Sequence, residues 1–277
     1  MRYAIVLLLL TSVALAQAPS GASDQTSDQT PPNDRPASSL STDQDNIRKA
    51  KTVLDQGIQA LGGQAYLTWQ EQSQQGRAYS FHHGEANSLG TLFWRFKKYP
   101  DKERVELTKK RDVIEIFNGD KGYEVTYKGV RNLEAKEELD PYVRRHHYAL
   151  EIVLREWLNQ PGIALFYEGQ TVAAQKETDQ VTIMNSRNEA VTLNFDINSH
   201  LPVKKKFTWR DPTDKERNVE EEIYDNYRMV QNIMTAFDVT RLYNGEMAAQ
   251  SFLTSASYNQ PLNDSMFDPH AAAEKRK

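Results

Sequence analysis

Two histidine pairs are the residues whose type first suggests metal chemistry. His82-His83 stands close to Glu85, and His146-His147 lies in a long amphipathic segment. Neighbouring side chains point to opposite faces of a strand, and they diverge by about 100° on a helix, so neither pair places two imidazoles on one ion easily. We therefore expect a solvated strand end at His82-His83, one half-buried and one exposed histidine at His146-His147, and no metal site.

The carboxylates could perform acid–base chemistry, but their spacing does not favour it. Glu220-Glu221-Glu222 and Asp225 fall on an alternating segment, which is more typical of a solvated strand face than of a general acid and its base. The sequence has no nucleophile elbow and no phosphate-binding glycine loop. We expect a protein that is not an enzyme and uses no cofactor. A secreted hydrolase whose site is assembled from distant residues is the weaker alternative.

Large apolar side chains recur along the chain and suggest binding rather than catalysis. The candidates for an apolar ligand surface are Trp94, Phe96, Phe117, Tyr123, Leu150, Val153 and Trp157. For most of them an ordinary hydrophobic core is the simpler interpretation. A curved sheet covered by a helix can also enclose an apolar ligand, so the sequence leaves both interpretations open.

The segments that must position these residues are mostly strands. Apolar residues at three- and four-residue spacing predict a helix over residues 46–61, which Gly62-Gly63 ends. From Tyr66 the period changes to two, and short alternating runs separated by polar turns predict an antiparallel meander. The fold class we expect is mainly β with α: a single strongly curved antiparallel sheet, or half-barrel, covered by one or more helices.

One long helix is predicted to interrupt the strands. Between Pro141 and Asn159, residues including His146, Leu150 and Trp157 fall on one helical face, and Pro161-Gly162 follows the end of the pattern. Such a face has to rest on apolar surface. We therefore expect this helix to lie over the concave side of the sheet as a lid.

The N-terminus predicts export. Arg2 precedes an apolar run, and Ala14-Leu15-Ala16 supplies the small-residue pattern that signal peptidase reads, so residues 1–16 are predicted to form a signal peptide cleaved before Gln17. An uncleaved anchor is the less favoured alternative, because the run is shorter than the about 20 residues that span a bilayer. We expect a disordered linker over residues 17–45, one domain over 46–268 and a polar tail over 269–277.

Composition narrows the class of partner. The 277-residue chain has a formal net charge of −4, so its charge balance does not argue for nucleic acid. It contains no cysteine, and its fold must therefore depend on a packed core even in the oxidising periplasm. No second apolar run is long enough to span a membrane.

Five segments carry an ordered pattern of strands and turns. They are residues 90–106, with the strand, the turn at Tyr99-Pro100 and the next strand; the hairpin of 117–123; the turn of 195–203; the block of 227–239; and the end of 258–267. In this order they resemble the periplasmic outer-membrane lipoprotein carrier and lipoprotein-sorting (LolA-like) superfamily, from about Gly57 to Phe267. The best-known carrier has an arginine just before the proline of the first segment, where this chain has Tyr99.

The resemblance implies a non-enzymatic periplasmic protein that binds acyl chains of a lipid or lipoprotein in an apolar half-barrel cavity. It implies inner- and outer-membrane transport partners, a lid made by the helices, and a place for Tyr99 among the ligand-binding residues. Shielding an acyl chain from water contributes about 0.8 kcal/mol per buried methylene. The competing hypothesis is a secreted structural or interaction module of the same fold, with a filled core and no ligand.

Overall fold

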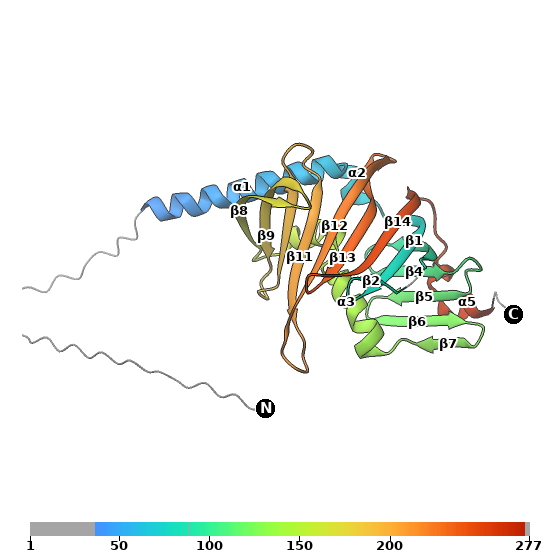
Figure 1. Ribbon diagram of the computed structural model, residues 1–277. Coiled ribbons are helices and arrows are strands. Elements are labelled where there is room, and N and C mark those ends of the chain that lie inside the picture. Colours follow the sequence, from blue (N-terminus) through green and yellow to red (C-terminus); the bar gives the residue numbers. More distant parts are fainter. Residues whose placement is uncertain (1–36, 88, 275–277) are drawn as a thin grey trace, which may run out of the picture. The chain divides into compact units, whose positions relative to one another are not determined.

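One antiparallel sheet organises the fold (Figure 1). The computed structural model describes residues 37–87 and 89–274. Within this part of the chain the strand order is β7-β6-β5-β4-β3-β1-β14-β13-β12-β11-β10-β9-β8, with the short β2 paired to β1. The sheet is not closed, since β7 and β8 are its two edges. The predicted fold class, a single large antiparallel sheet with covering helices, is confirmed.

The strands follow the alternation of the sequence. They are β1 (Glu71–His82), β2 (Glu85–Ala86), β3 (Thr91–Lys98), β4 (Lys102–Leu107), β5 (Val113–Asn118), β6 (Lys121–Thr126), β7 (Gly129–Asn132), β8 (Ala164–Ala173), β9 (Lys176–Met184), β10 (Ala190–Asp196), β11 (Pro202–Arg210), β12 (Arg217–Val230), β13 (Ile233–Tyr243) and β14 (Glu246–Tyr258). The helical segments are α1 (Ala37–Leu61), α2 (Gln64–Thr68), η1 (Ala135–Leu139), α3 (Asp140–His147), α4 (Leu150–Arg155), η2 (Trp157–Asn159), η3 (Asp264–Phe267) and α5 (Pro269–Glu274).

The first and last strands join two meanders into one sheet. From β1 the chain runs through β3 to β7 at one edge, and the helical segments η1 to η2 carry it to β8 at the other edge. It returns through β9 to β14, which pairs with β1 in a register that sets Gln72 opposite Tyr258. The central part of the sheet therefore combines residues from both ends of the domain.

Helix α1 ends where the glycine pair predicts. The Gly63 N–H donates to the Ile58 carbonyl at 2.9 Å, and the Gly62 N–H donates to the Gln59 carbonyl at 3.1 Å, which is the paired capping of a Schellman motif. The start differs from the prediction, because α1 begins at Ala37 rather than at Asn46. Residues 37–45 of the predicted linker are thus helical. The predicted signal peptide and residues 17–36 lie outside the described residues.

The concave face over β8 to β11 is filled. Side chains of α1 and α4, among them Leu54 and Val153, pack with strand residues such as Leu193 and Phe195 in the larger hydrophobic core. The approach is close at Gly57, where a Cβ would lie 2.3 Å from the ring of Phe195. This half of the sheet has an ordinary packed interior.

The predicted lid helix is two helices rather than one. Helix α3 ends at His147, and α4 starts at Leu150 after Ala149, whose extended backbone (φ −62°, ψ 144°) breaks the helical hydrogen bonding. Tyr148 at the break is buried and stacks on Phe207 with ring centroids 4.1 Å apart. No glycine or proline marks the break, so the helical spacing in the sequence continues across it.

The C-terminal residues cover the outer face of the other half. Phe267 and Ala272 are buried in a second core cluster with strand residues Ile114, Ile116 and Val125. The predicted polar tail is therefore, as far as residue 274, the helix α5 packed on the sheet. Because α5 and η3 lie here, this half carries apolar residues on its outer face as well as its inner one.

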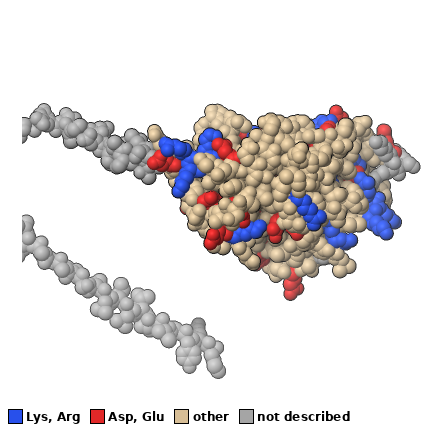
Figure 2. Space-filling model, turned by 90° about the horizontal axis from the view of Figure 1, so that it is seen from above, with Lys and Arg blue, Asp and Glu red and all other residues tan. Residues whose placement is uncertain are grey.

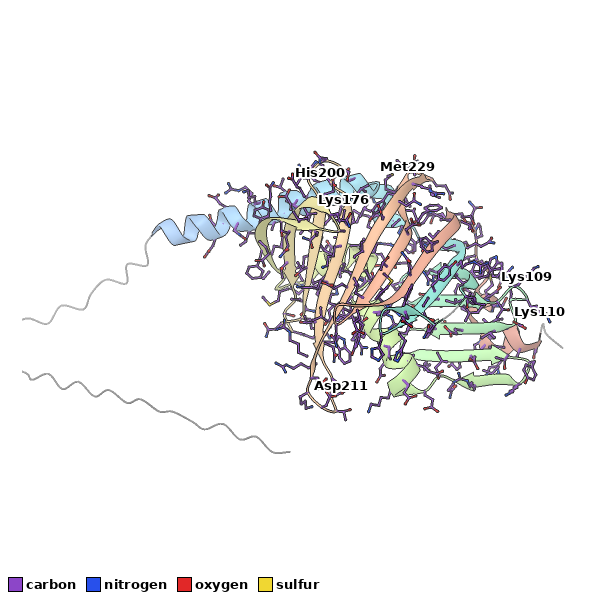
Figure 3. All side chains as sticks on the ribbon, viewed as in Figure 1. Lys109, Lys110, Lys176, His200, Asp211 and Met229 are labelled. Carbon is purple, nitrogen blue, oxygen red and sulfur yellow. The ribbon has the colours of Figure 1, made fainter. Side chains whose placement is uncertain are left out.

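The hairpin turns define two ends of the sheet (Figure 3). Lys176, His200 and Met229 lie at the end that α1 crosses, here called the α1 end, and Asp211 lies at the opposite, Asp211 end.

In the view of Figure 2 basic and acidic side chains are interspersed rather than gathered into one basic patch. Among the described residues, no helix is long and apolar enough to cross a membrane.

Candidate functional site

A cavity of about 670 Å³ occupies the part of the concave face that the core leaves unfilled. Its walls come from β1, β3, β4, β5 and β12 to β14, and residues of α2, α3 and α4 cover it. The volume lies within the range of roughly 300–1,000 Å³ found for small-molecule sites. The half-barrel thus has one filled half and one hollow half.

Strand register explains which side chains face the cavity. Directly paired residues share a face of the sheet, and one such row crosses β12, β13, β14 and β1 as Tyr224, Val239, Ser251 and Ala78. All four residues of this row line the cavity. Small residues at Ser251 and Ala78 leave room that larger side chains would occupy.

Aromatic residues surround the cavity at the α1 end. Trp69 lies against Tyr258 with ring centroids 5.8 Å apart, and both side chains are nearly fully buried. The Tyr258 hydroxyl lies 2.9 Å from both Gln72 Nε2 and Thr235 Oγ1, which satisfies its hydrogen bonding away from water. This end of the cavity offers apolar ring surface without an unpaired polar group on Tyr258.

Two ion pairs are formed by residues that line the cavity. Lys97 on β3 lies 2.7 Å from Glu151 on α4, and Arg95 lies 3.1 Å from Glu103. Burial opposes ionisation of Glu151, but the Lys97 ammonium outweighs burial and lowers the pKa of Glu151 to about 2. These charges are thus neutralised in place, and one of the pairs links the covering helix to the sheet.

Glu115 on β5 lines the cavity without a cation of its own. It makes no hydrogen bond or ion pair within the described part of the chain. Burial raises the pKa of Glu115, and the nearby carboxylates Glu103, Glu124 and Glu138 raise it further. A protonated Glu115 presents a neutral hydrogen-bond donor to the cavity.

Tyr99 lies at the rim. It lines a small recess beside the cavity, and its hydroxyl donates to Glu156 at 2.7 Å. The Arg155 guanidinium lies 3.4 Å from the centroid of the Tyr99 ring, and Trp69 packs edge-on to the same ring. Burial and the Glu156 carboxylate raise the pKa of Tyr99, so this tyrosine stays neutral.

The structure brings two of the predicted ligand-binding residues into the cavity. Phe117 and Leu150 line it, and Phe117 stacks on Tyr142 with centroids 3.6 Å apart. Val153 and Trp157 lie instead in the filled core, and Trp157 is only 1% exposed. The break between α3 and α4 explains this correction, because the predicted face of one helix is divided between the cavity and the core.

Trp94, Phe96 and Tyr123 lie on the opposite face of the sheet, and the expectation that they line the cavity is corrected. Phe96 and Tyr123 belong to one register row with Ile116, and Ile116 and Phe96 both belong to the outer core cluster. Trp94 shares this outer face, two residues before Phe96, and carries the Arg111 guanidinium 4.8 Å from its ring. Apolar character in the sequence could not distinguish the two faces of the sheet, because the outer face is also apolar where helix α5 covers it.

The prominent cavity residues missed from the sequence are mostly charged or aromatic residues next to breaks and turns. They are Trp69, Tyr142, Arg145 and Arg241. Trp69 directly follows α2, a helix too short to show periodicity. The sequence pattern predicts that the two arginines are exposed to solvent, because a charged residue on an amphipathic element is normally assigned to its solvated face.

The histidine pairs follow the expectation from their spacing only in part. Both His146 and His147 are half-buried, so the expected exposed histidine is wrong, and the rings of His82 and His83 lie with centroids 4.2 Å apart rather than on opposite faces. His146 lines the cavity, whereas His147 lies 3.0 Å from Glu189, outside the lining. His82 and His83 lie at a strand end, where His83 is 3.6 Å from Glu246. Within residues 37–87 and 89–274, no group of three or more potential metal ligands comes together.

Similarity to known proteins is detectable in structure rather than in sequence. No protein-family model matches the sequence, and no curated protein matches it significantly. A DUF1329 family protein from Desulfovibrio piger superposes with a TM-score of 0.55 at 11% identity, over 81% of this chain and 98% of that one. A protein described as an outer membrane lipoprotein-sorting protein domain from Vibrio parahaemolyticus gives 0.52 at 9% identity, over 79% and 97%.

The fold is LolA-like. A LolA superfamily protein from Nitrosomonas europaea aligns with a TM-score of 0.49 at 10% identity, over 79% of this chain and 96% of that one. The resemblance predicted from the order of strand and turn segments is confirmed for the fold by the two structures that superpose with TM-scores above 0.5. Since a LolA-like fold at such identity does not fix an activity, function has to be argued from the cavity.

Proposed function

We propose that this chain is a non-enzymatic periplasmic carrier or binder of lipid or lipoprotein acyl chains. The acyl chains lie in the cavity between the concave face of the sheet and the helices α2 to α4. The single observation that carries the proposal is this cavity of about 670 Å³, open on the inner face of a LolA-like half-barrel whose other half is filled.

Apolar surface along the cavity supports an acyl ligand. Phe93, Leu107 and Phe117 line it from the sheet, and Leu150 faces it from α4. Each methylene that leaves water against such surface contributes about 0.8 kcal/mol. Arg95 and Lys97 are paired with Glu103 and Glu151, so an acyl chain that lies beside these two pairs does not strip water from an isolated charge.

The predicted signal peptide and the fold support a periplasmic location for the proposed carrier. A LolA-like half-barrel is the fold of a domain described as sorting outer membrane lipoproteins, and the present chain shares that fold over most of its length. A carrier of this kind takes its cargo from an inner-membrane donor and passes it to an outer-membrane acceptor. These two kinds of partner belong to the proposal.

The filled half of the sheet favours one competing function. Leu193, Phe195 and Phe207 are covered by helices there, as in a structural or interaction module with no ligand. Such a module does not account for the hollow half, where small residues such as Ala78 and Ser251 face open space. The two proposals differ in whether an acyl probe enters the cavity.

Titration with the fluorescent fatty acid cis-parinaric acid tests the proposal. Wild-type protein should increase the probe's fluorescence saturably. Replacing Ala78 by Trp places an indole ring in the cavity and should weaken binding at least tenfold, whereas Ser255→Trp on the exposed outer side of β14 should leave binding unchanged. Both variants should keep a cooperative unfolding transition in urea.

Two results would favour the module instead. One is a wild-type protein that never binds the probe. The other is binding that Ala78→Trp leaves intact and Ser255→Trp abolishes, since this would place the probe on the outer surface.

A further inference from the structure

Two arginines without an anionic partner line the cavity near the Asp211 end. Arg145 comes from α3 and Arg241 from β13, and both line the cavity. Neither side chain makes an ion pair or hydrogen bond within residues 43–87 and 89–274. Their positive charges are close enough to repel one another.

The nearby carboxylates are bound by other groups. Glu220 accepts from Arg144 Nε at 3.0 Å, and the Arg144 guanidinium also lies 3.5 Å from the ring centroid of Trp209. Glu222, directly opposite Arg241 in the strand register, lies 2.8 Å from Lys205 Nζ.

Tyr224 completes the environment of Glu222, because its hydroxyl donates to that carboxylate at 2.6 Å. The local set therefore contains four cations, Arg144, Arg145, Lys205 and Arg241, against two carboxylates. Of this set, Arg145, Arg241 and Glu222 line the cavity, so this end of it carries a local excess of positive charge.

Burial makes this excess charge costly. Burial and, after it, the Arg241 charge lower the pKa of Arg145 to about 10. A half-buried guanidinium regains favourable interactions when an anion accepts its N–H groups, and planar guanidinium groups suit carboxylate and phosphate oxygens.

We propose that Arg145 and Arg241 bind the anionic head group, a carboxylate or phosphate, of the amphiphile held in the cavity. This inference rests on the proposed function, because it assigns the polar part of the same ligand. It makes the cavity selective for acidic amphiphiles over neutral ones with the same chain.

The cavity has the polarity that such a ligand requires. Thr235, which contacts Tyr258 at the aromatic end, and Arg241 lie six residues apart on β13, roughly 20 Å at about 3.3 Å per residue. The hydrophobic end is thus at Trp69 and Tyr258, and the cationic end is at the arginines. A head group at Arg241 directs its chain toward the aromatic rings.

A matched pair of probes tests the head-group assignment. The measurement compares cis-parinaric acid with its methyl ester, which has the same chain and no charge. Wild-type protein should bind the acid at least tenfold more tightly than the ester. Arg145→Gln and Arg241→Gln should each weaken acid binding about tenfold and leave ester binding unchanged.

Arg217→Gln is the control, since Arg217 is an exposed arginine at the start of β12. Arg145→Lys should restore part of the preference for the acid. Melting temperatures of all variants show whether the fold is kept.

The outcomes separate the two proposals. Equal binding of acid and ester by wild-type protein, unchanged in both glutamine variants, would overturn the head-group assignment and leave acyl binding standing. Binding of neither probe would overturn the proposed function itself. If inorganic phosphate alone binds as tightly as the acid through the same arginines, the site is for a free anion and the head-group assignment is wrong.

Discussion

Lys97 on β3 and Glu151 at the start of α4 form an ion pair across the cavity, with Nζ 2.7 Å from Oε1 and with 23% and 19% of the two side chains exposed. The pair ties the covering helix to the sheet at a point between the filled and hollow halves. Breaking it leaves one buried charge without a partner. The free energy of unfolding should therefore depend on this pair.

Replacing Glu151 by Gln should lower stability at neutral pH, with an effect that fades in acid. The folded-state pKa of Glu151 is about 2, below its ordinary value near 4.5, so its contribution is present above 4.5 and is lost as the pH falls toward 2. Urea unfolding at several pH values checks this. A difference between wild type and variant that stays constant down to pH 2 would show that the ion pair does not stabilise the fold.

Glu115→Gln should change stability at neutral pH in the opposite direction, by raising the free energy of unfolding. Burial and neighbouring carboxylates raise the folded-state pKa of Glu115, so ionisation of this group destabilises the fold as the pH rises through that pKa. The glutamine variant should unfold at a higher urea concentration than wild type at neutral pH, and the gain should vanish in acid below the ordinary carboxyl pKa. A variant that is less stable than wild type at neutral pH would contradict this account.

Gly57→Ala should destabilise the domain although alanine favours helix formation. A Cβ at this position would lie 2.3 Å from the buried Phe195 ring, so α1 has to move away from β10. We expect a cost of about 1–3 kcal/mol. The control is Gln56→Ala at the exposed neighbouring position, which should be neutral or slightly stabilising. An equal gain in stability from both changes would mean that α1 does not pack on β10 as described.

Lys205→Met should cost about 3–5 kcal/mol, because it leaves the Glu222 carboxylate without its cation. Lys205 is 0% exposed and lies 2.8 Å from Glu222. Adding Glu222→Gln to Lys205→Met should recover most of the loss, since the double variant removes both charges of this pair. Chemical denaturation of the single and double variants measures this coupling. Additive losses would indicate that the two charges do not interact.

Alternation and turn chemistry predicted the sheet but not which face of it is hollow. Gly62-Gly63 ends α1 as expected, and the long runs of period two became antiparallel strands. Phe96 and Phe117 look alike in sequence, yet they lie in adjacent register rows that point to opposite faces, and the outer face is also apolar because distant residues such as Phe267 cover it. Which face is covered and which is hollow depends on where the C-terminal residues pack in three dimensions.

The sequence also did not predict which charged residues lie in the interior. Lys205 stands between Lys204 and Lys206, where a run of lysines suggests solvent, yet the strand period turns it inward toward Glu222. The cationic pair Arg145 and Arg241 lies far apart in sequence and meets only through the crossing of α3 over β13. A sequence pattern assigns such residues to a wet surface, since it cannot see the partner that satisfies them or the cavity that they face.

Native mass spectrometry of the exported protein tests the central claim most directly. Protein purified without added lipid should carry a bound mass equal to an acyl-bearing amphiphile, released on denaturation and depleted in the Ala78→Trp variant, whose cavity is narrowed by the indole ring. The Ser255→Trp control should retain that mass. A wild-type protein that is folded but always free of bound lipid, and that stays so after incubation with acyl-bearing lipids, would contradict the carrier account.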